Sequence, residues 1–128
     1  MTSIHDLSPG FRHVRLLLAR NAGEPAGSAN EGYDLLVPLQ ADGKLDPVEW
    51  KHKQDHCRVR YFRAGEEDRI GKLRRKPGGQ WYFDYEEGEA DDERGFRLGD
   101  EQFVLGEYVS ITRGGQTFTY QVARVEKP

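Results

Sequence analysis

Short runs of alternating apolar and polar residues, separated by Gly and Pro, cover most of the chain. The clearest run is Gln116–Val125, where Phe118, Tyr120 and Val122 alternate with polar or small residues. Because successive side chains of a β-strand point to opposite faces, this pattern predicts a half-buried strand. Similar runs bounded by turn residues predict further strands at His13–Asn21, Tyr33–Leu39, Arg58–Arg63, Ile70–Lys76, Gln80–Tyr85, Phe96–Leu98, Phe103–Leu105 and Glu107–Arg113.

One helix is predicted near residues 47–56. Asp46 can cap it, Pro47 suits its first position, and Glu49 has the spacing of a capping box. Val48 and Trp50 can then pack against the sheet. One short helix among closely spaced strands predicts an all-β (β-dominated) fold, either a small barrel or a strongly curved antiparallel sheet of about eight short strands.

The chain has 128 residues, which is near the common size of one domain. Residues 1–10 are polar and lack periodicity, so we expect a flexible leader followed by a single β-rich domain at 11–128. Residues 22–32 contain three Gly and one Pro and predict a loop. The single cysteine, Cys57, and the lack of a long apolar run predict a cytoplasmic protein that does not span a membrane.

Charge is segregated along the chain although its net charge is only −3. Residues 57–80 contain eight basic and three acidic side chains, whereas residues 81–101 contain nine acidic and two basic ones. The basic segment coincides with three predicted strands. A surface of one sign on a sheet is a candidate for contact with a partner of opposite charge.

The register of these three strands decides which basic residues share a face. A three-residue loop at 77–79 would place Lys72 opposite Asp84 and Leu73 opposite Phe83. A loop centred near residue 67 would place Arg60 opposite Arg74 and Arg58 opposite Lys76, and such like-charged pairs are destabilising unless something lies over them. The candidate binding residues are therefore Arg58, Arg60, Phe62, Lys72, Arg74, Lys76 and Tyr82.

Two kinds of partner fit this basic face. The first hypothesis is a non-enzymatic binding module that contacts an acidic protein or anion. The alternative is a module for single-stranded RNA or DNA, because a positive sheet with an aromatic residue can attract phosphates and stack bases. A sequence pI of about 5.8 disfavours nucleic acid, and the acidic run 86–93 can fold over the face. A patch around Phe62 and Tyr82 also makes a homodimer possible.

Candidate catalytic chemistry is sparse. His52 and His56 are four residues apart on the predicted helix and are weak candidates for a metal site, because no third ligand is evident. Cys57 follows His56, but a nucleophile also needs a base and an oxyanion site. No phosphate loop, dinucleotide fingerprint or paired-cysteine motif occurs in the chain. The sequence predicts no catalytic residue and no cofactor, and a metal-dependent or other enzyme is the third alternative.

Overall fold

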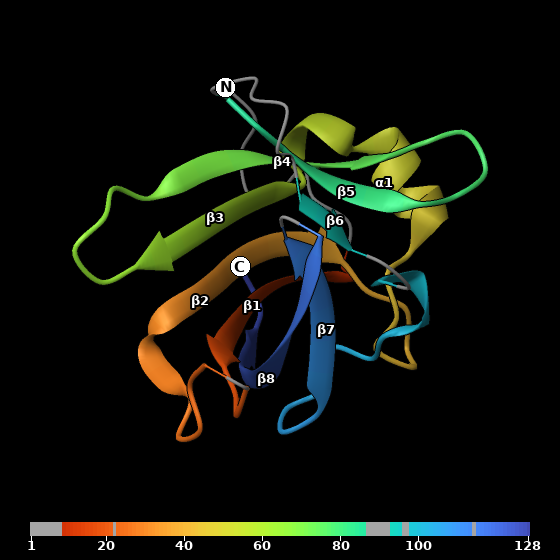
Figure 1. The fold of residues 1–128 in the computed structure, drawn as a ribbon. Coiled ribbons are helices and arrows are strands. Elements are labelled where there is room, and N and C mark those ends of the chain that lie inside the picture. Colours follow the sequence, from red (N-terminus) through yellow and green to blue (C-terminus); the bar gives the residue numbers. More distant parts are fainter. Residues whose placement is uncertain (1–8, 22, 87–92, 96–97, 114) are drawn as a thin grey trace.

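The described residues of the computed structural model, 9–21, 23–86, 93–95, 98–113 and 115–128, form a small antiparallel β-barrel with one short helix (Figure 1). The predicted β-dominated fold is confirmed. The elements in chain order are β1 (Phe11–Leu18), β2 (Ser28–Pro38), α1 (Pro47–His52), the 3-10 turn η2 (Gln54–His56), β3 (Arg58–Arg63), β4 (Arg69–Arg75), β5 (Trp81–Tyr85), β6 (Glu93–Gly95), the 3-10 turn η3 (Leu98–Asp100), β7 (Tyr108–Arg113) and β8 (Gln116–Glu126).

Each strand pairs with the strands that precede and follow it in the sequence, and β8 returns to pair with β1. The junctions differ in width. The β1–β2 ladder extends from Phe11 opposite Pro38 to Leu18 opposite Ser28, whereas β6 and β7 meet only where Arg94 lies opposite Thr112. The register of each ladder identifies which outward residues of adjacent strands lie side by side.

Aromatic rings fill the centre of the barrel. The ring of Tyr33 on β2 lies 5.0 Å from that of Tyr61, 5.4 Å from that of Phe83 and 5.0 Å from that of Tyr120, measured between centroids. Tyr33, Phe83 and Tyr120 are fully buried. Since tilted and edge-on aromatic pairs are favourable, these contacts connect the β3–β5 side of the barrel to the β7–β8 side.

Strand β2 begins at Ser28, inside the segment predicted as a loop. Its Gly- and Asn-rich start resembles loop composition, but Gly32 lies opposite Leu17 in the β1–β2 ladder. A Cβ atom at Gly32 would lie 1.8 Å from the carbonyl oxygen of Leu16. The glycine is therefore needed for close approach of two strands rather than for a turn.

The predicted helix is shorter than expected. Asp46 caps α1 as predicted, because its side chain accepts hydrogen bonds from the backbone N–H groups of Val48 and Glu49. The capping box does not close, since the Asp46 N–H donates instead to the Pro38 carbonyl at 3.0 Å. Trp50 packs inward and donates its indole N–H to the Leu73 carbonyl at 2.8 Å, whereas Val48 is 64% exposed and does not pack on the sheet.

Two predicted strands differ from the structure. Residues 103–105 form no strand, although Phe103 is buried and its N–H donates to the Gly43 carbonyl. The short strand predicted at 96–98 lies instead at Glu93–Gly95, and Leu98 belongs to η3, while residues 96 and 97 fall outside the described part of the chain. The apolar run at 103–105, followed by Gly106, gave the strand pattern, but these residues belong to no ladder of the described structure.

Most of the predicted leader lies outside the described residues, and so does 87–92 of the acidic run. Pro9 and Gly10 form a turn, and the Gly10 carbonyl accepts a hydrogen bond from the Leu39 N–H at 2.9 Å. Among the described residues, no helix is long and apolar enough to cross a membrane.

Candidate binding surface

The outward positions of β3, β4 and β5 form a continuous surface on the side of the barrel that carries α1 (Figure 1). The alternation within each strand buries Val59, Leu73 and Phe83 and leaves the intervening residues outside. Arg58 lies opposite Lys72 and Lys72 opposite Asp84, while Arg74 lies opposite Tyr82. We call Arg58, Lys72, Arg74, Lys76 and Tyr82 the basic face.

The register predicted for the β4–β5 hairpin is confirmed. Leu73 lies opposite Phe83 and Lys72 opposite Asp84, and the Lys76 N–H donates to the Gln80 carbonyl. Gly78 and Gly79 have φ angles of 97° and 91°, in the left-handed region that glycine tolerates. The Pro-Gly-Gly loop therefore sets this register as the sequence indicates.

The register predicted for the β3–β4 hairpin is wrong. Arg60 lies opposite Ile70 rather than Arg74, and Arg58 lies opposite Lys72 rather than Lys76. The turn is centred on Gly65, whose φ is 81°, and the Glu66 N–H donates to the Arg63 carbonyl at 3.1 Å. A tight turn at the glycine moves β4 along β3, so neither of the two expected pairs forms, although Arg58 still lies opposite another cation, Lys72.

Two carboxylates partly neutralise the basic face. Asp55 of η2 lies 3.5 Å from the Lys72 ammonium and 3.8 Å from the Arg74 guanidinium, and Asp84 lies 3.7 Å from Arg74. The Asp55 side chain is 75% exposed, so these ion pairs are screened by water and weak. Four cations thus face two carboxylates.

Arg58 and Lys76 form no ion pair within the described part of the chain. The Lys76 ammonium lies over the Tyr82 ring at 5.4 Å from its centroid, within the range of a cation–π interaction. Tyr82 itself is partly exposed. The basic face therefore presents two cations that have no carboxylate partner among the described residues, and one of them adjoins an aromatic ring.

Arg60 and Phe62 belong to a separate cluster. The Arg60 guanidinium donates to Asp34 and, at 3.2 Å, to Asp68, while Arg15 donates to the other side of Asp34 at 3.2 Å. The guanidinium carbons of Arg15 and Arg60 lie 4.5 Å and 5.7 Å from the centre of the Phe62 ring. The hydrogen bond to Asp34 raises the pKa of Arg60. Two of the predicted binding residues, Arg60 and Phe62, thus already contact other side chains of the protein.

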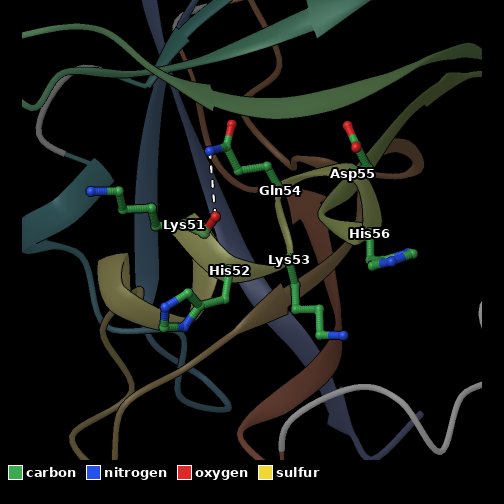
Figure 2. Close-up of a pocket in the computed structure, with 6 residues that line it drawn as sticks. All are labelled: Lys51, His52, Lys53, Gln54, Asp55 and His56. Atoms are coloured by element: carbon green, nitrogen blue, oxygen red, sulfur yellow. Dashed lines mark hydrogen bonds between the residues drawn. The ribbon is translucent and has the colours of Figure 1, made fainter.

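The two histidines do not share a helix face. α1 ends at His52 and Lys53 leaves the helical conformation, so His56 falls in η2. In Figure 2 the imidazoles of His52 and His56 extend in different directions, with Lys53 between them. No group of three or more potential metal ligands occurs among the described residues.

The segment from Lys51 to His56 nonetheless lines a shallow pocket beside β4 (Figure 2). Gln54 closes one side of it by donating to the Lys51 carbonyl at 3.4 Å. Its lining contains Lys51 and Lys53 as well as the two histidines, and Asp55 connects it to Lys72 and Arg74. The pocket is therefore a polar extension of the basic face.

Cys57 does not have the surroundings of a nucleophile. Its side chain is fully buried, and its thiol donates to the Lys53 carbonyl at 3.4 Å. Burial raises the pKa of the Cys57 thiol to about 12, against a smaller lowering effect of Arg74. A reactive cysteine needs the opposite shift, because the thiolate is the nucleophile.

A polar cluster that the sequence analysis missed lies beside the aromatic core. Glu31 is 13% exposed and accepts hydrogen bonds from the Tyr61 hydroxyl at 2.9 Å and from Arg113 at 3.2 Å. Arg63 approaches the same carboxylate at 3.6 Å. These residues come from three distant segments, so no local pattern could group them. Burial and ion pairing make this cluster a structural support.

Comparison with known protein families, with curated proteins and with solved structures found no match to this chain. The chemistry of the barrel surface is therefore the basis for inferring a function.

Proposed function

We propose that this protein is a small non-enzymatic binding module that contacts an acidic protein or anion through the basic face. The observation that carries the proposal is the excess of cations there: Arg58 and Lys76 lack carboxylate partners within the described residues, and Lys72 and Arg74 share two exposed ones. A cytoplasmic setting remains part of the proposal, on the basis of a single cysteine, which is buried.

The partly exposed cations suit a partner that brings its own carboxylates or phosphates. Exposed ion pairs at 3.5–3.8 Å contribute little to folding, so Asp55 and Asp84 can exchange their contacts for those of a partner. Tyr82 adds an amphipathic ring of the kind enriched at protein interfaces. Arg60 and Phe62 are not part of the proposed contact set, because Asp34, Asp68 and Arg15 hold them.

The test compares two double variants of equal charge. Arg58→Glu with Lys76→Glu changes the basic face, and Arg124→Glu with Lys127→Glu changes exposed residues at the end of the chain. Binding of a fluorescent polyglutamate peptide is measured by anisotropy in 50 mM and 200 mM NaCl. We expect the first variant to bind at least about tenfold more weakly and the second to bind within about twofold of the natural protein.

Two outcomes would contradict the proposal. Equal losses in both variants would mean that only net charge matters, and absence of binding to the peptide would remove an acidic protein as the partner. A single-stranded oligonucleotide measured in the same way tests the alternative. Tight, strongly salt-dependent binding that Tyr82→Ala weakens would favour single-stranded nucleic acid, because base stacking on an aromatic ring contributes about 1–3 kcal/mol per base.

A further inference from the structure

Three cations of the basic face follow one another at alternate positions along β4. Lys72 and Arg74 lie on the strand, and Lys76 follows directly after its last residue. Between them, Leu73 is buried, and the Arg75 guanidinium lies over the ring of a buried tryptophan. Because a strand rises about 3.3 Å per residue, the Cα atoms of successive cations lie about 6.6 Å apart. The basic face thus contains a line of positive charge with a two-residue period.

One carboxylate of the chain already shows how this line binds an acidic group. The Oδ1 atom of Asp55 lies 3.5 Å from the Lys72 ammonium and 3.8 Å from the Arg74 guanidinium, so two successive cations share one carboxylate oxygen. The contact is open to water, because the Asp55 side chain is 75% exposed. Lys76, at the end of the line, has no carboxylate partner among the described residues. A carboxylate from another molecule can therefore take the place of Asp55, and a second one can bind next to Lys76.

The pairing of β4 determines how a partner approaches this line. β4 pairs with β3 on one side and with β5 on the other, so a partner lies over the outer side chains and does not join the sheet as a strand beside β4. An extended peptide has the same rise per residue as β4, and its successive side chains point to opposite sides. Acidic residues at every second position of such a peptide therefore match the spacing of the three cations.

We propose that the partner of the basic face is an extended peptide segment with an acidic residue at every second position. This inference rests on the proposed function and adds the sequence pattern of the partner. Successive carboxylates of the segment bind along the line formed by Lys72, Arg74 and Lys76, and one of them displaces Asp55. The residues between the acids point away from β4, so their identity contributes little to affinity.

The surroundings of Tyr82 favour a peptide over single-stranded nucleic acid. Stacking of a base requires an open face of an aromatic ring. The Lys76 ammonium lies over the Tyr82 ring at 5.4 Å from its centroid, and the ring is only partly exposed. A base stacked there has to displace this cation, which then no longer neutralises a phosphate at that position. A carboxylate bound next to Lys76 leaves the cation–π contact in place.

The experiment compares two fluorescent peptides by anisotropy at one NaCl concentration. The peptides have the same length and the same numbers of glutamates and serines, and both ends are capped. One has glutamate at every second position, and the other has it at every third; polyglutamate is measured alongside. We expect the first peptide to bind at least about fivefold more tightly than the second, because only the first places successive carboxylates about 6.6 Å apart.

Variants of the protein test the line of cations directly. Arg74→Gln removes the central cation, so the preference for the first peptide should fall to less than about twofold. Lys76→Gln shortens the line at an exposed position and should lower the preference in the same direction. Arg124→Gln is the matched control, since this arginine of β8 is 60% exposed and lies off the basic face; it should leave the preference unchanged. Circular dichroism and a melting curve confirm that each variant is folded.

Several outcomes overturn the proposal and leave the proposed function standing. Equal affinity for the two peptides, or binding of polyglutamate alone, would show that the density of acids matters and their spacing does not. A preference that survives both Arg74→Gln and Lys76→Gln would place the contact elsewhere. A single-stranded oligonucleotide that displaces the first peptide at a lower concentration than the unlabelled peptide itself would identify nucleic acid as the better partner. Failure of all three peptides to bind would instead contradict the proposed function.

Discussion

The basic face and the outer surface of the β7–β8 ladder lie on opposite sides of one barrel, and both use the same alternation of inward and outward residues. On the basic face, Arg58, Lys72 and Arg74 alternate with buried residues, whereas the outward positions of the β7–β8 ladder hold tyrosine, serine, threonine and glutamine side chains without formal charge. The inward residues of both sides meet in a common core around Tyr33. Because the core fixes only the inward positions, the difference in charge outside is independent of the fold.

The largest expected effect comes from the ring that connects the two sides. Tyr33→Ala removes contacts to Tyr61, Phe83 and Tyr120 and leaves a cavity, so we expect a loss of about 3–5 kcal/mol in the free energy of unfolding. Urea denaturation followed by circular dichroism measures it. Tyr33→Phe keeps the ring and should cost less. A loss below about 1 kcal/mol for Tyr33→Ala would mean that the two sides are stabilised independently.

A smaller effect is expected at Asp34, beside the basic face. Asp34→Ala leaves Arg15 and Arg60 adjacent without the carboxylate that binds both, and we expect a loss of about 1–2 kcal/mol in the free energy of unfolding. The partly exposed arginines limit the loss, since water and salt screen them.

Asp84→Ala is the control for Asp34, because Asp84 pairs with Arg74 at the longer distance of 3.7 Å and has a side chain that is 41% exposed. Its removal should change the free energy of unfolding by no more than about 0.5 kcal/mol. Urea denaturation at low and high salt compares the two. Equal losses would contradict the distinction between the Asp34 cluster and the basic face.

The smallest effect on stability is expected at Asp55. Asp55→Asn removes a 75% exposed carboxylate, so the free energy of unfolding should stay within about 0.5 kcal/mol. Affinity for the polyglutamate probe should rise by about two- to fivefold, because Lys72 and Arg74 lose a competing charge. Glu126→Gln, which removes the partner of Arg124 elsewhere, should leave affinity unchanged. An unchanged affinity in Asp55→Asn would argue against Lys72 and Arg74 as contact residues.

The sequence predicted the fold class and the outward direction of the basic residues, because strand alternation and turn residues are local signals. The β4–β5 register was predicted correctly because the Pro-Gly-Gly sequence at 77–79 indicates a three-residue loop. The β3–β4 register was wrong because several residues between Arg63 and Arg69 could have formed the turn, and only the structure identifies Gly65 as its centre. Local sequence patterns thus predict which way a side chain points better than they predict the register between two strands.

The sequence could not predict which cations are already paired. Asp34 is 26 residues before Arg60, and Asp55 precedes Lys72 by 17, so only the barrel brings these charges together. Asp34, a single aspartate near the start of the otherwise apolar Tyr33–Leu39 run, was the available signal for the first pair. The prediction that His52 and His56 share a helix face was wrong for a local reason, because α1 ends at His52 and does not include His56.

The buried position of Cys57 has a practical consequence for measuring how this barrel opens. It is the only thiol in the chain, it is 0% exposed, and its raised pKa keeps it protonated at pH 8. A thiol reagent therefore reacts only with molecules in which the junction between η2 and β3 has opened. At high reagent concentration, the labelling rate equals the rate of that opening. The natural chain thus contains a single site for a kinetic probe, and no substitution is needed to introduce one.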